Sequence, residues 1–191
     1  MRCIAPLTRR QAQLADKMLE LMLAEGFSRL TIDNLTDRLG CSKRTLYALA
    51  DSKEQLATRS VSRFFKQATD QVEASICRTR SPAQRLTGYL EAVARALEPA
   101  SRDFMADVAA FTPAREVYEL NTQLATRRVR ELIVQGTGAG AFRKVPPDFV
   151  AEVVSSTMRR IATGEMQSAT GLTDAEAYHQ LAKLVLAAVR R

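Results

Sequence analysis

Apolar residues recur every three to four positions along most of this chain, which is the spacing of amphipathic α-helices. Clear start signals separate these helices: Ser81-Pro82 places a capping residue before a proline, and Thr173 with Glu176 forms a capping box. Valine and isoleucine do not alternate with polar residues between turn signals, as they would in exposed strands. The pattern therefore predicts an all-α protein of about nine helices.

The pattern also predicts how some helices are connected. Asp51 with Glu54 resembles another capping box, and it opens a long helix whose apolar stripe continues to Ile76. The glycine-containing runs 136–140 and 164–171 predict two loops.

One stretch, Thr31–Lys53, contains two short helical patterns joined by a tight turn. Thr31 can cap the first helix and Ser42 the second, because their hydroxyls can accept from otherwise unpaired backbone amides. Gly40 stands where a helix end favours a positive φ. A helix, a turn containing glycine and a second helix form the pattern of a helix-turn-helix DNA reader.

Charge supports this interpretation. The chain of 191 residues carries a formal net charge of +7, and residues 1–66 contain 12 of its 28 Lys and Arg but only 7 of its 21 Asp and Glu. A basic N-terminal third suits contacts with DNA phosphates.

Several classes of protein are disfavoured. Three widely spaced cysteines, Cys3, Cys41 and Cys77, argue against a disulfide framework. His179 is the only histidine, and no glycine-rich phosphate loop or paired catalytic carboxylates are apparent, so no enzyme, metal site or cofactor is predicted. No signal peptide or membrane-length apolar run is visible, which predicts a cytoplasmic protein with no membrane partner.

The final helix is apolar around nearly its whole circumference, and such a helix needs burial on more than one side. Together with the helix before it, it predicts a homodimer with a four-helix interface. The alternative is that both helices form the centre of a monomeric bundle.

The stretch Thr8–Phe65 resembles the tetracycline-repressor (TetR/AcrR) family of bacterial transcriptional regulators. The resemblance rests on Gly26-Phe27 at the end of the first helix, a Thr-initiated helix over Thr31–Leu39, the turn and recognition helix over Gly40–Tyr47, and Ser52-Lys53-Glu54 at the start of the fourth helix. Beyond residue 65 it rests on helix number and length.

Two positions depart from the family pattern. The family often has Gly or Ala where this chain has Arg44, and usually an aromatic residue where it has Ala50. Arg44 adds a hydrogen-bond donor to the recognition helix, and Ala50 removes a core ring.

The resemblance implies a DNA-binding domain over residues 1–52 and a larger helical domain for ligand binding and dimerisation over residues 53–191. The implied function is a ligand-responsive transcriptional regulator, most often a repressor. It would bind a double-stranded palindromic operator as a homodimer and be released by a small-molecule effector.

By resemblance, Lys43 and Arg44 contact base edges, and Thr45 contacts a thymine methyl group or a phosphate. The implied phosphate contacts come from Thr31, Ser42, Tyr47 and Lys53. The alternatives are that Thr31 and Ser42 only cap helices, that Tyr47 is a core ring, and that Lys43 and Arg44 form a solvated surface.

The family's effector cavity lies among the middle helices, and the implied lining here is Phe104, Met105, Val108, Phe111 and Tyr118. The alternative is that these residues form ordinary core. Two other functions stay open: a helical carrier or interaction module without specific DNA binding, and a regulator controlled by a partner protein.

Overall fold

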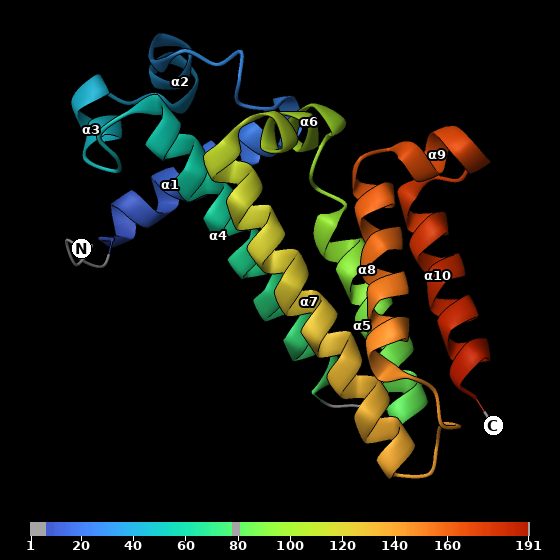
Figure 1. The fold of residues 1–191 in the computed structure, drawn as a ribbon. Helices are drawn as coiled ribbons and strands as arrows, with labels where there is room; N and C mark the ends of the chain where they lie inside the picture. The colour runs from blue at the N-terminus through green and yellow to red at the C-terminus, as the bar shows by residue number, and fades with distance from the viewer. Residues whose placement is uncertain (1–6, 78–80, 191) are drawn as a thin grey trace. The chain divides into compact units, whose positions relative to one another are not determined.

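The computed structural model describes residues 7–77 and 81–190, and within these ranges the chain forms ten helices and no strand (Figure 1). The all-α prediction is thus confirmed. The helices are α1 (Arg9–Glu25), α2 (Ile32–Leu39), α3 (Lys43–Tyr47), α4 (Lys53–Ile76), α5 (Pro82–Leu97), α6 (Arg102–Ala110), α7 (Thr112–Gly138), α8 (Pro147–Ala162), α9 (Glu165–Thr170) and α10 (Asp174–Val189).

Side-chain caps fix several helix starts, as the sequence predicts. Thr31 and Thr173 both form capping boxes, with Asn34 and Glu176 as their respective partners. The box predicted at the start of α4 is wrong by one residue. Ser52, rather than Asp51, provides the cap, because its Oγ accepts a hydrogen bond from the backbone amide of Gln55 at 3.2 Å.

The two predicted glycine loops are partly helical. Helix α7 continues through Gly138, and the chain then folds back so that the amides of Ala141 and Phe142 both donate to the Gly136 carbonyl. A Cβ at Gly136 would lie 2.2 Å from the Phe142 ring, so glycine there permits close packing. In the second predicted loop the chain forms an additional helix, α9. Gly164 and Gly171, which flank this helix, both adopt a positive φ.

The chain divides into two compact units. The first unit contains the residues up to Phe64 together with Ala100–Val117, and the second contains Phe65–Pro99 together with the chain from Tyr118 onward. Helices α4 and α7 therefore each contribute to both units. No helix in the part of the chain that the structure describes is long and apolar enough to cross a membrane.

Each unit has its own core. In the first unit, phenylalanine rings from α4, α6 and the residues that follow α1 and α6 pack edge to face, with centroid separations of 5.6–6.1 Å. In the second unit, α10 packs against α5 and α8, and a buried apolar cluster joins these helices to the second halves of α4 and α7.

Candidate nucleic-acid interface and effector cavity

The turn between α2 and α3 has the backbone geometry that the sequence predicts. Gly40 adopts the left-handed conformation, with φ 60° and ψ 42°. The Ser42 hydroxyl then caps α3 by accepting from the Thr45 amide at 3.2 Å. Leu46 is fully buried on one side of α3, whereas Lys43, Arg44 and Tyr47 are exposed on the other, so α3 presents a polar face to solvent.

The exposed residues of α3 differ in their pairing. Lys43 Nζ lies 2.5 Å from Asp33 Oδ1 on α2, and this hydrogen bond raises the pKa of the lysine. The Arg44 side chain is exposed and makes no hydrogen bond or ion pair with the described residues. Tyr47 is 45% exposed and therefore does not act as a core ring.

Lys53 reaches back to the loop that follows α1, where its Nζ donates to the Ser28 carbonyl at 2.8 Å. The same loop is held by Asp107 on α6, whose Oδ2 accepts from the amides of Phe27 and Ser28 at 2.5 and 2.8 Å. Sequence reasoning missed Asp107, because nothing local marks a carboxylate that caps a loop 80 residues earlier. Ser28 therefore hydrogen-bonds both to Lys53, a predicted phosphate contact, and to Asp107 on α6.

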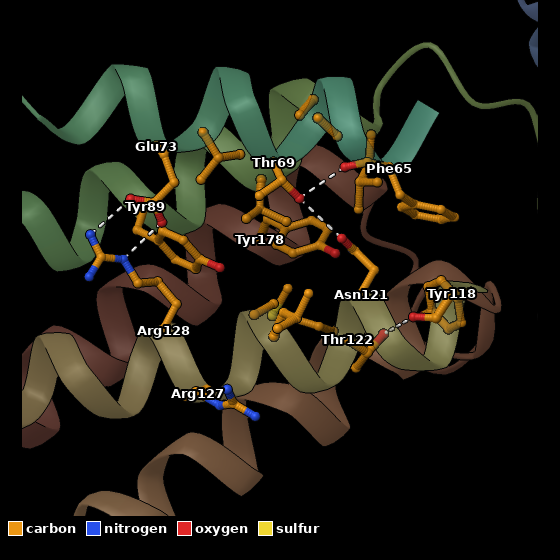
Figure 2. Close-up of a pocket in the computed structure, with 18 of the residues that line it drawn as sticks. Phe65, Thr69, Glu73, Tyr89, Tyr118, Asn121, Thr122, Arg127, Arg128 and Tyr178 are labelled. Carbon is orange, nitrogen blue, oxygen red and sulfur yellow. Dashed lines mark hydrogen bonds and ion pairs between the residues drawn. The ribbon is translucent and has the colours of Figure 1, made fainter. Parts of the chain in front are cut away.

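The second unit contains a cavity of about 280 Å³, lined by α4, α5 and α7 with one residue each from α8 and α10 (Figure 2). Of the predicted lining residues, Tyr118 is at this cavity. Phe104, Val108 and Phe111 instead lie in the first unit, where Phe104 and Phe111 both pack on Phe27, and Met105 is half-buried on α6.

The cavity wall is mainly apolar, with a cluster of three charged side chains. Arg128 donates to both carboxylate oxygens of Glu73 at 2.8 Å and to Glu131 at 3.0 Å. Tyr89 and Tyr178, which sequence reasoning did not select, also line the wall. Burial raises the pKa of both phenols, so they stay protonated near neutral pH.

An apolar groove lies along α8, α9 and α10, with a volume of about 580 Å³. Its margins include Phe149 and Leu184, which are 67% and 68% exposed, and Val153. Large apolar side chains that stay this exposed are commonly found at protein interfaces. The groove involves both of the helices from which the sequence predicts a dimer.

The described part of the chain also contains free cysteines and other potential metal-ligating side chains. No group of three His, Cys, Asp or Glu residues is placed to hold a metal ion there. Burial raises the pKa of the Cys41 thiol, which disfavours the reactive thiolate. Cys3 lies outside the described residues.

Comparisons with known proteins agree with this geometry. Residues 16–59 match the family model described as bacterial regulatory proteins, tetR family. This range includes the turn, α3 and the first part of α4. No curated protein matches the chain in sequence.

Solved structures share the fold over nearly the whole chain. A Saccharomonospora viridis protein in complex with choline has a TM-score of 0.80 at 16% identity, covering 97% of this chain and 100% of its own. A TetR/AcrR-family regulator from Thermobifida fusca has a TM-score of 0.70 at 21% identity, with coverage of 96% and 100%. The fatty acid degradation regulator FadR from Bacillus halodurans has a TM-score of 0.73 at 12% identity, with coverage of 95% and 96%.

Proposed function

Because this chain belongs to the tetR family of bacterial regulatory proteins, we propose that it is a repressor that binds a palindromic operator as a homodimer and is released by a small molecule. The observation that carries the proposal is the helix-turn-helix, in which α3 is capped, anchored by buried Leu46 and exposes Arg44. We assign DNA contacts to Thr31, Ser42, Lys43, Arg44, Thr45, Tyr47 and Lys53, within a DNA-binding region of residues 1–52.

DNA binding is tested by a gel shift on the DNA upstream of the coding sequence, at two salt concentrations. Affinity is expected to fall as salt rises, because lysine and arginine displace counterions from phosphates. Arg44→Ala should weaken specific binding by about 1–3 kcal/mol, the value of a bidentate contact to guanine. The control Arg95→Ala removes the same charge from an exposed position on α5 and should have little effect.

If the wild-type chain binds none of the upstream DNA, the repressor proposal fails and a helical carrier becomes the better interpretation. Equal losses in the Arg44 and Arg95 variants would mean that binding is only electrostatic.

Dimerisation is proposed through the groove of α8 and α10. A dimer that covers this groove would bury Phe149 and Leu184, and a two-fold axis would place two α3 helices on two operator half-sites. Light scattering of Leu184→Glu should show a monomer. Leu120→Glu, which makes the same change at an exposed position on α7, should leave the dimer intact.

The cavity of the second unit is the proposed effector site, and the choline complex of a protein with the same fold supports a small-molecule ligand. Of the five residues that the sequence predicts as ligand contacts, Tyr118 lines this cavity and is a proposed contact, whereas the four residues of the first unit are not at it. Helix α4 belongs to both units and is the proposed coupling element. The effector must bind one conformation more tightly than the other, or operator affinity does not change.

A further inference from the structure

Two tyrosine hydroxyl groups at the cavity make no hydrogen bond to a described residue, and neither oxygen is fully enclosed by the protein. They belong to Tyr89 on α5 and Tyr178 on α10, which are only 4% and 3% exposed. Figure 2 shows both rings in the space between α4 and α7. A hydroxyl that opens onto a cavity can hydrogen-bond to water or to a ligand that enters the cavity. Two such groups in one cavity are therefore available to hydrogen-bond a ligand.

The other polar side chains of the wall are largely occupied by one another. Arg128 is held between Glu73 and Glu131, with all three of its hydrogen bonds at 2.8–3.0 Å. The Thr69 hydroxyl lies 3.1 Å from Asn121 Oδ1, which leaves only the amide nitrogen of Asn121 as a further donor. A charged ligand would have to compete with the ion cluster for a counterion, whereas an uncharged ligand leaves it intact.

Arg127 is the remaining charged residue of the lining. It is exposed to solvent, which screens its charge, and in Figure 2 its side chain points away from the rings of Tyr89 and Tyr178. It therefore does not provide a buried cation for an anionic ligand.

We propose that this cavity binds a small, uncharged molecule with a largely apolar body and two oxygen-containing polar groups, which hydrogen-bond to the hydroxyls of Tyr89 and Tyr178. The inference rests on the proposed function, since it names the chemical class of the effector. The volume of about 280 Å³ lies just below the usual range for ligand pockets, about 300–1,000 Å³, which favours a single-ring compound. Both phenols are protonated and can donate to a ketone, ether or hydroxyl oxygen.

The test is titration calorimetry of the full chain, without DNA, against four aromatic probes of similar size. Two probes are uncharged: 4-methoxyacetophenone has two oxygens, and 4-isopropyltoluene has no polar atom. The other two are the anion 4-methoxybenzoate and the cation 4-methoxybenzyltrimethylammonium. The neutral probe with two oxygens should bind most tightly. Tyr89→Phe and Tyr178→Phe should each lower the affinity for that probe by about 2- to 12-fold, the factor for one hydrogen bond. Neither variant should change the affinity for 4-isopropyltoluene, which serves as the matched control.

Four results would overturn the inference: tighter binding of either ion, equal binding of the hydrocarbon, no loss in either tyrosine variant, or no binding of any probe at millimolar concentration. Operator release is measured separately, by fluorescence anisotropy of labelled upstream DNA. A probe that binds as expected but leaves DNA affinity unchanged would support the ligand class while refuting the proposed release by the effector.

Discussion

The two units use aromatic residues in opposite ways. In the first unit the rings of Phe27, Phe64 and Phe104 pack against each other edge to face and fill the core. In the second unit the rings of Tyr89 and Tyr178 border an open cavity, with their hydroxyls unpaired by any described residue. Phenylalanine can complete a dry core because it has no polar atom, whereas a buried phenol needs a partner. The two clusters thus differ in polarity, because the first is closed by rings alone and the second presents two hydroxyls to a cavity.

The largest expected effect is at Phe104, the fully buried centre of the first aromatic cluster. Phe104→Ala should lower the free energy of unfolding by about 3–5 kcal/mol, because it removes buried surface and leaves a cavity. Urea denaturation at fixed protein concentration measures this. Leu120→Ala, at a 58% exposed position, is the control and should cost little. A loss below about 1 kcal/mol at Phe104 would mean that this core is not tightly packed.

Asp107 should have the next largest effect, because its carboxylate satisfies the two amides of Phe27 and Ser28 in the first unit. Asp107→Ala is expected to cost about 2 kcal/mol, since hydrogen bonds to charged groups are among the stronger ones. The matched variant Asp103→Ala, on the same helix, removes only a favourable helix-dipole interaction and should cost less than about 1 kcal/mol. Equal costs would show that the loop does not depend on Asp107.

A substitution at Ser60 should change the free energy of unfolding by less, and in the opposite direction. Its hydroxyl is buried on α4 and has no hydrogen-bond partner among the described residues. Ser60→Ala should stabilise the protein by about 1 kcal/mol, because it removes an unpaired polar group and improves helix propensity. Thermal unfolding measures the gain. Ser62→Ala, which removes an exposed hydroxyl bonded to the Thr58 carbonyl, is the control. Destabilisation at Ser60 would indicate that this hydroxyl has a partner in solution.

The smallest expected effect contrasts most directly with Phe104. Tyr178→Phe in the ligand-free protein should change the free energy of unfolding by no more than about 0.5 kcal/mol, since it breaks no hydrogen bond within the described residues. Chemical denaturation without added ligand measures it. A loss of 1 kcal/mol or more would show that the hydroxyl is already paired by the protein, and the second cavity would then resemble the filled core of the first unit.

Local features of the fold could be predicted from the sequence, and long-range ones could not. The caps at Thr31 and Thr173 and the turn at Gly40 depend on neighbouring residues, and the structure has all three. Phe104 lies in the first unit and Tyr118 in the second. Their placement depends on which halves of α4 and α7 they pack with, because these two helices are shared by both units. Both are aromatic residues at helical spacing, so periodicity alone does not separate them.

The ion pair between Lys43 and Asp33 has a consequence for how such a protein would search a chromosome. Transient binding to arbitrary DNA depends on unpaired positive charge, and a carboxylate 2.5 Å from the lysine removes part of that attraction. If Lys43 and Arg44 contact DNA as proposed, this ion pair would shorten the lifetime of complexes on unrelated sequences and leave more of the discrimination to Arg44. The acidic residue at the start of α2 would then disfavour binding to unrelated sequences.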